Sequence, residues 1–315
     1  MILNRGVFLQ DMLVGCTGFV GGNLTACHSF ESQYHSTNIE AAFGTRPQLL
    51  IYAGVPAAKY LANTDPEADW AVCRAAAENI RAIKPDKLVL ISTADVFSDS
   101  RRADEGTKPD FDNPQAYGRN RAQLEQLVRA DFPNTLILRL PALYGTGLKK
   151  NFLFDLHTIT PTMLQKEKYL ELAGRSALVR DSYETDTNNF YRLSSGADKV
   201  ALRAFFAEND FNALSFTDSR SHYQFYPLSR LWRDICTALD AGLTLLHLAP
   251  PPVPAAEIHA AVTGRYNWEN HLAAPPADYD LHTRHAALFG SSGNYLCGKK
   301  EELNSILSFM RNWKV

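Results

Sequence analysis

Residues 12–24 read MLVGCTGFVGGNL. A short apolar run ends at Val14 and is followed at once by three spaced glycines, Gly15, Gly18 and Gly21. Glycines at these steps let the backbone turn tightly from a strand into a helix, whose free N–H groups can bind a pyrophosphate. The stretch therefore predicts a strand, a phosphate-binding turn and a helix. The alternative interpretation is an ordinary turn that contains glycines.

Apolar runs recur along the first half of the chain, at residues 49–53, 88–91 and 136–140. They are continuous rather than alternating, which is typical of parallel strands buried on both faces. Helical patterns lie between them, at residues 69–83 and 116–130. This order predicts an α/β protein with a doubly wound, Rossmann-like parallel sheet.

The rhythm breaks after residue 150, where the chain becomes polar, and returns with an apolar run at residues 243–248. Two parts are therefore expected, the second a smaller, mostly C-terminal lobe that binds substrate. We predict a dinucleotide-binding domain at 1–150, completed by about 225–250, and a substrate-binding lobe at 151–224 and 251–315.

The composition is ordinary for a soluble globular protein, with 45% hydrophobic and 21% charged residues. A net charge of −2 provides no broad positive field to attract nucleic acid or an anionic membrane. No apolar run approaches the ~18 residues of a membrane span. The five cysteines are scattered without a CxxC pair, which predicts no metal site and favours a reducing compartment. We expect a cytoplasmic protein with a small-molecule substrate.

Several stretches resemble the extended short-chain dehydrogenases/reductases, which include nucleotide-sugar epimerases, dehydratases and 4-keto-sugar reductases. They are GCTGFVGGNL at 15–24, IYAG at 51–54, ISTADVF at 91–97, YGRNR at 117–121 and LRLPALYG at 138–145. The resemblance implies a nicotinamide cofactor and hydride transfer.

By this resemblance, Thr93, Tyr117 and Arg121 occupy the catalytic positions. The family's tyrosine moves a proton to or from the substrate oxygen, and its Ser/Thr hydroxyl hydrogen-bonds that oxygen. Arg121 stands where the family has a lysine that lowers the pKa of the tyrosine and holds the ribose. Arginine favours tyrosinate but cannot give up a proton, so slow or lost turnover is expected. Without the resemblance, Tyr117 and Arg121 fit a solvated helix face.

The resemblance also implies a set of cofactor-binding residues on the turn and at the strand ends. They are Gly15, Thr17, Gly18, Phe19, Val20, Gly21, Asn38, Ile39, Ala53, Gly54 and Pro141. NAD binders usually carry an acidic residue after the second strand, but residues 33–39 hold neither a carboxylate nor an arginine. The choice between NAD and NADP stays open.

Four residues are candidates for contact with a substrate: Lys59, Lys149, Asn151 and Arg220. Lys59 would place an amine near the catalytic set. Lys149 and Asn151 follow the last matched strand, where they equally fit a solvated loop. Arg220 would bind a phosphate or pair with nearby Asp218.

The sequence thus predicts an NAD(P)-dependent oxidoreductase or epimerase that acts on a nucleotide-linked sugar, with Tyr117 as acid/base. The alternatives are a non-catalytic dinucleotide-binding sensor or scaffold, and an interaction module without a cofactor. A homodimer, paired through the helices at 69–83 and 116–130, is expected from similar proteins.

Overall fold

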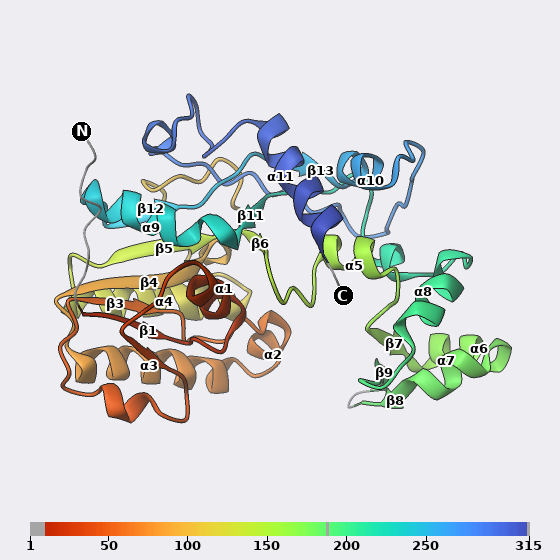
Figure 1. Cartoon of the computed structure of the whole chain (residues 1–315), viewed down its shortest axis with the longest axis horizontal. Helices are drawn as coiled ribbons and strands as arrows, with labels where there is room; N and C mark the ends of the chain where they lie inside the picture. Colours follow the sequence, from red (N-terminus) through yellow and green to blue (C-terminus); the bar gives the residue numbers. More distant parts are fainter. Residues whose placement is uncertain (1–9, 187–188, 314–315) are drawn as a thin grey trace. The chain divides into compact units, whose positions relative to one another are not determined.

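The computed structural model describes residues 10–186 and 189–313. Its centre is a six-stranded sheet in which every neighbouring pair is parallel. The strands, in spatial order, are β12 (Leu245–His247), β5 (Leu136–Leu140), β4 (Lys87–Thr93), β3 (Leu49–Tyr52), β1 (Asp11–Val14) and β2 (Ser32–Tyr34) (Figure 1). The predicted Rossmann-like α/β fold is confirmed.

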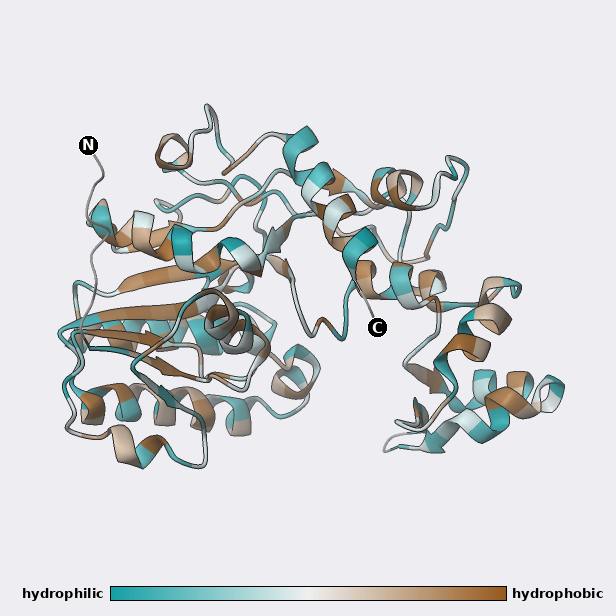
Figure 2. Cartoon of the chain, viewed as in Figure 1, coloured by the Kyte–Doolittle hydropathy of each residue, from teal (hydrophilic) through white to brown (hydrophobic). Residues whose placement is uncertain are grey.

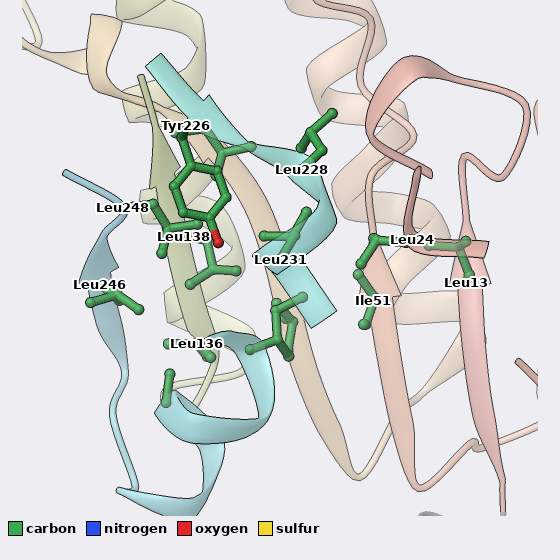
Figure 3. Close-up of a cluster of buried hydrophobic side chains, with 14 of the residues drawn as sticks. Leu13, Leu24, Ile51, Leu136, Leu138, Tyr226, Leu228, Leu231, Leu246 and Leu248 are labelled. Carbon is green, nitrogen blue, oxygen red and sulfur yellow. The ribbon is translucent and has the colours of Figure 1, made fainter. Parts of the chain in front are cut away.

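One face of this sheet packs against α1 (Phe19–Cys27) and α9 (Leu231–Asp240). Successive side chains of a strand point to opposite faces, so alternate residues of each strand contribute to this cluster. Figure 3 shows the cluster, in which Leu13, Ile51 and Leu138 from three strands lie with Leu24 and Leu231 from the two helices. These five side chains are fully buried.

The other face packs against α3 (Pro66–Ile83) and α4 (Ala116–Asp131), the two helices that the sequence predicts. Met12 and Leu50 represent the intervening strand positions that supply this second cluster. Figure 2 shows the central strands in hydrophobic colours, whereas α3 carries both colours along its length. The alternation fits a helix with one buried stripe and one solvated stripe.

The described chain divides into two compact units. Unit 1 contains the residues up to Leu148, His222–Val253 and Asp278–Phe309, and unit 2 contains Lys149–Ser221, Pro254–Ala277 and the residues from Met310 on. The sequence placed all of 251–315 in the second lobe, whereas the stretch Asp278–Phe309 belongs to unit 1. Gln224 explains this difference, because its side-chain amide donates to and accepts from the backbone of Leu281. A pattern of apolar residues cannot predict a hydrogen bond between a polar side chain and a distant backbone.

Unit 1 also contains four short strands and two helices outside the central sheet. They are β6 (Ala142–Tyr144), β10 (His222–Tyr223), β11 (Phe225–Pro227), β13 (Val253–Pro254), α2 (Lys59–Thr64) and α11 (Lys299–Asn312). The last residues of β13 and α11 are assigned to unit 2. β6 and β11 pair in parallel. No helix within the described residues is long and apolar enough to cross a membrane.

Unit 2 combines helices with a small antiparallel sheet. The helices are α5 (Phe152–Thr158), α6 (Lys166–Arg175), α7 (Ala177–Ser182), α8 (Lys199–Ala207) and α10 (Ala255–Thr263), and the sheet has the order β7 (Met163–Gln165), β9 (Phe190–Leu193), β8 (Tyr183–Thr185). Its core includes Leu164, Leu202 and Phe206, all essentially inaccessible to solvent. Unit 2 therefore has a hydrophobic core of its own.

A buried ion pair links the end of the parallel sheet to α4. Arg139 on β5 donates to both carboxylate oxygens of Glu125, at 3.1 and 2.6 Å, and Ser92 on β4 donates to Glu125 at 2.5 Å. Arg139 Nη1 also lies 3.2 Å from Nε2 of His247 on β12, whose Nδ1 lies 3.0 Å from the His282 carbonyl oxygen. Burial lowers the pKa of His247, so it accepts from Arg139 as a neutral ring. Three adjacent strands and one helix thus share a network of polar side chains.

Glu302 on α11 is a second buried acidic group, and no cation pairs with it as Arg139 pairs with Glu125 among the described residues. Its side chain is 1% exposed, and Oε1 has no hydrogen-bond partner among the described residues. Burial raises the pKa of Glu302 to about 8. The folded chain therefore holds this proton to a higher pH than the unfolded chain does.

The stability that depends on this proton is complete below about pH 4.5, the ordinary pKa of the group, and is lost progressively as the pH rises from there to about 8. We expect Glu302→Gln to remove the loss, because a neutral amide replaces a group that must ionise. Relative to the unchanged protein, its free energy of unfolding should gain up to about 1.4 kcal/mol per pH unit across this window. Urea unfolding at a series of pH values measures it. Glu301→Gln, at the exposed neighbouring position, is the control and should give a nearly parallel curve.

Candidate functional site

The glycine turn after β1 is shaped by close backbone contacts. Gly15 has φ +94°, and a Cβ there would lie 2.4 Å from the Ala53 carbonyl oxygen at the end of β3. At Gly21 a Cβ would lie 2.1 Å from the Gly15 carbonyl oxygen. Larger residues would therefore force the first turn of α1 away from the two strand ends.

The start of α1 is open at this turn. Gly18 is the N-cap and provides no side-chain cap, and the first helical turn carries no acidic residue. Thr17 and Gly18 are exposed, while Phe19 and Val20 are half-buried and pack against the core. The uncapped N–H groups and the positive end of the helix dipole suit a diphosphate.

The other predicted cofactor residues lie at the C-terminal ends of the strands. Ala53 and Gly54 follow β3, and Pro141 follows β5. Asn38 and Ile39 follow β2, where the Asn38 side-chain oxygen accepts from the His35 N–H at 2.7 Å. These positions therefore lie at one edge of the sheet, the edge at which ligands bind in open α/β folds.

Thr93 is the last residue of β4 and is nearly buried. Its hydroxyl oxygen accepts from the Asp95 N–H at 3.1 Å and donates to the Asp95 carboxylate at 3.4 Å. Thr93 also lies near enough to the Tyr117 hydroxyl to lower the pKa of that phenol. The structure thus brings together two of the three predicted catalytic side chains.

Tyr117 lies in the first turn of α4 and is 8% exposed. Its backbone N–H donates to Asn63 on α2 at 3.0 Å. Burial raises the pKa of Tyr117, and the nearby Asp95 carboxylate adds to the rise. Arg121 and Lys59 act in the opposite direction through their charges. The phenol is therefore surrounded by two cations and one anion.

Gly118 lets α4 approach the turn that holds Asp95. A Cβ at Gly118 would lie 1.8 Å from the Asp95 carbonyl oxygen. The same oxygen accepts from the Asn113 amide at 3.0 Å. This close contact sets the separation between the helix that carries Tyr117 and the strand that carries Thr93.

Arg121 is 4% exposed and is held on α3 and on the loop after β3. Its guanidinium pairs with the Asp69 carboxylate and donates to the Pro56 carbonyl oxygen at 2.7 Å. It also lies over the Tyr117 ring, 4.0 Å from the centroid. The guanidinium thus contacts the face of the phenol, and its hydrogen bonds are directed to Asp69, Pro56 and the Tyr117 backbone.

Lys59, the first residue of α2, lies on the other side of this site. Its amine donates to Asp95 Oδ1 at 2.7 Å, and its side chain is 43% exposed. Burial disfavours its charge, but Asp95 outweighs this effect, so the pKa of Lys59 is raised. Tyr279 also interacts with the charge of Lys59. Sequence reasoning missed both residues. Asp95 lies within the matched stretch 91–97, but the resemblance gives it no role, and Tyr279 lies outside every matched stretch.

The remaining three substrate candidates, Lys149, Asn151 and Arg220, belong to unit 2. Lys149 is exposed. The Asn151 side-chain oxygen caps α5 by accepting from the N–H groups of Leu153 and Phe154. Arg220 pairs with both oxygens of Asp218, at 2.9 and 2.7 Å, and holds the pKa of that carboxyl well below its usual range. The sequence allowed Arg220 either to bind a phosphate or to pair with Asp218, and the structure contains the ion pair with Asp218.

Unit 2 has a cavity of about 560 Å³ with a mixed polar and apolar lining. Cationic, acidic and aromatic side chains line it, among them Arg203, Arg265, Glu269 and Trp268. Trp268 stacks on His259, with ring centroids 4.8 Å apart. The sequence offers no signal for this cavity, because its walls come from separate stretches of the chain.

Comparison with known proteins finds a family whose pattern matches this chain and solved structures that share its fold. The pattern of the family described as "RmlD substrate binding domain" matches residues 12–169. The solved structure of dTDP-4-dehydrorhamnose reductase from Yersinia enterocolitica shares 14% identity and has a TM-score of 0.60, covering 95% of this chain and 99% of that chain. No match was found among the curated proteins.

Two further solved structures have the same fold. The dTDP-4-dehydrorhamnose reductase from Bacillus anthracis, in complex with NADP, shares 16% identity, with a TM-score of 0.60 and coverage of 96% of this chain and 98% of that chain. UDP-glucose 4-epimerase from Thermotoga maritima, with UDP-glucose, shares 12% identity, with a TM-score of 0.59 and the same two coverages.

Proposed function

Because the chain belongs to the RmlD substrate binding domain family, we propose that it is an NAD(P)-dependent oxidoreductase or epimerase acting on a nucleotide-linked sugar. The observation that carries this proposal is that the Thr93 and Tyr117 side chains lie near each other at the carboxyl end of β4. Two neighbouring hydroxyls can together bind one carbonyl oxygen and deliver a proton to it.

The residues present fit a dinucleotide. The turn from Gly15 to Gly21 has no room for side chains at its two ends, and its helix start is uncapped. Its backbone would hold the diphosphate, and Ala53, Gly54 and Pro141 would lie along the remainder of the cofactor. When bound, a nicotinamide dinucleotide supplies or accepts the hydride. Tyr117 then gives a proton to the substrate oxygen during reduction, or takes it during oxidation.

The substrate contacts are part of the same proposal. Lys59 is available in unit 1 through its partly exposed amine. Separately, in unit 2, we propose Lys149 and the half-exposed Arg220, which also pairs with Asp218, as cations for a phosphate, and the Asn151 amide as a further donor. The reductase and epimerase structures named above bind NADP and UDP-glucose, which supports a nucleotide-linked sugar as the substrate class. A homodimer through α3 and α4 and a cytoplasmic location complete the proposal.

One observation favours the second candidate, a dinucleotide-binding protein without catalysis. Arg121 replaces the family's lysine, and its guanidinium is engaged by Asp69 and Pro56. A sensor or scaffold would need the glycine turn but not a reactive phenol.

Tyr117→Phe is expected to lower kcat by about 10²–10⁴-fold on a panel of 4-keto nucleotide sugars, because the variant lacks the transferred proton. Binding of NADH and NADPH, measured by calorimetry, should stay unchanged. Tyr266→Phe, at an 88% exposed position, is the matched control and should retain full turnover.

Two results would count against an enzyme. Dinucleotide binding without Tyr117-dependent turnover on the panel favours the sensor. Failure to bind either dinucleotide contradicts both candidates and leaves the interaction module.

A further inference from the structure

We propose that Lys59, and not Arg121, is the positioning residue that supplies a solvent-accessible cation to Tyr117, and that this cation offsets the negative charge of Asp95. This inference deepens the proposed function and rests on it. Short-chain dehydrogenases/reductases carry the lysine that lowers the pKa of the tyrosine on the same helix as the tyrosine. Here the charge would come from α2.

The first step is that the guanidinium of Arg121 is already engaged by Asp69 and Pro56. Its side chain is 5% exposed, and the Asp69 carboxylate, itself 12% exposed, neutralises its charge at close range. The Pro56 carbonyl oxygen takes a second hydrogen bond at 2.7 Å. A guanidinium fixed in this way stays protonated and cannot exchange a proton with solvent. Its contact with Tyr117 is with the ring face.

The second step is that α2 is aligned on Tyr117 by a specific hydrogen bond. Asn63 accepts from the Tyr117 backbone N–H at 3.0 Å and donates to Gln115 at 2.5 Å. Lys59 precedes Asn63 by four residues, so both lie on one face of the helix. The bond that fixes α2 against the start of α4 therefore also holds Lys59 beside the turn that carries Asp95.

The third step is the connection of side chains from the amine to the phenol. Lys59 Nζ lies 2.7 Å from Asp95 Oδ1, and Asp95 Oδ2 accepts from the Thr93 hydroxyl at 3.4 Å. The backbone of Asp95 packs against Gly118, the neighbour of Tyr117 in the chain. Asp95 alone would disfavour tyrosinate by placing a negative charge beside it. Lys59 offsets that charge, and its 43% exposure leaves the ammonium in contact with water.

The charged groups around Tyr117 come from every element packed against it. They are Arg121 on α4, Asp69 on α3, Asp95 after β4, Lys59 on α2 and, next to Lys59, Tyr279. Only Lys59 combines a positive charge with substantial exposure among the cations that interact with Tyr117 in the described residues. It can therefore stabilise the tyrosinate that forms when the phenol O–H bond breaks and the substrate O–H bond forms.

The test uses the full chain without any ligand, so that it does not depend on the substrate. Stopped-flow pH jumps are followed by the absorbance of tyrosinate. Each protein is measured with and without Tyr117→Phe, and the difference between the two curves gives the titration midpoint of Tyr117. Lys59→Met should raise the Tyr117 midpoint by about one pH unit. Asp95→Asn should lower it by a similar amount. Lys59→Arg should leave it close to its original value, and Lys108→Met, at an exposed control position, should not move it.

The Tyr117 midpoint should rise in Lys59→Met and fall in Asp95→Asn. General damage to the site would instead move the midpoint in the same direction in both variants. An unmoved midpoint in Lys59→Met, or a shift of the same sign in both variants, overturns the proposal. Where turnover is found, Lys59→Met should lower kcat about tenfold, with a smaller change in KM. Loss of turnover with the predicted midpoints intact contradicts the proposed function only.

Discussion

Replacing Arg139 by methionine is expected to lower the free energy of unfolding by about 3–5 kcal/mol. The side chain is 2% exposed and donates to both oxygens of Glu125, which is equally buried. Without the guanidinium, the Glu125 carboxylate must either stay charged in an apolar setting or take up a proton. Urea unfolding, monitored by circular dichroism, measures the loss.

The double variant Arg139→Met/Glu125→Gln separates the charge from the packing. It removes both charges, so it should recover much of the stability that the single replacement loses. Arg101→Met, whose Asp99 pair is more than half exposed, is the surface control and should cost less than about 1 kcal/mol. A single replacement that costs no more than this control would contradict a stabilising role for the buried pair.

The second large effect is expected at Gly118. Alanine ordinarily stabilises a helix by up to about 1 kcal/mol relative to glycine. At Gly118, however, the added Cβ would lie 1.8 Å from the Asp95 carbonyl oxygen, and a backbone atom cannot move aside as a side chain does. α4 must shift away from β4, which separates Tyr117 from Thr93. We expect a net destabilisation of about 1–3 kcal/mol and at least about 10²-fold lower turnover.

Gly174→Ala provides the matched comparison within the same chain. Gly174 also lies in a helix, α6, but a Cβ there would meet no atom within 4 Å. This variant should be neutral or slightly more stable in thermal unfolding. Equal behaviour of the two alanine variants would mean that the contact between Gly118 and Asp95 does not fix the helix.

The strands that sequence reasoning located are those with continuous apolar runs. β3, β4 and β5 are buried on both faces, so their composition alone predicts them. β2 gives no such signal, because it consists of Ser32, Gln33 and Tyr34 at the sheet edge and pairs only with β1. The resemblance to extended short-chain dehydrogenases/reductases, drawn from the motifs, is confirmed by the family match.

The surroundings of the phenol were harder to predict, for a physical reason. A motif compares positions along the chain, so Arg121 was expected to substitute for the family's lysine. Its ion pair with Asp69 joins α4 to α3, and that of Lys59 with Asp95 joins residues 36 positions apart. Such pairs depend on how helices pack, which no local pattern records.

The order of the strands has a consequence for biosynthesis. β5 is covered on one side by β4, but its other neighbour, β12, begins only at Leu245. While the chain is emerging from the ribosome, β5 is therefore an open edge, and Arg139 lacks the imidazole of His247 until that residue has been added. This edge stays uncovered while the residues between Leu140 and Leu245, about a third of the chain, are being made. A truncated product that ends before β12 would keep this unpaired strand, which can pair with other chains.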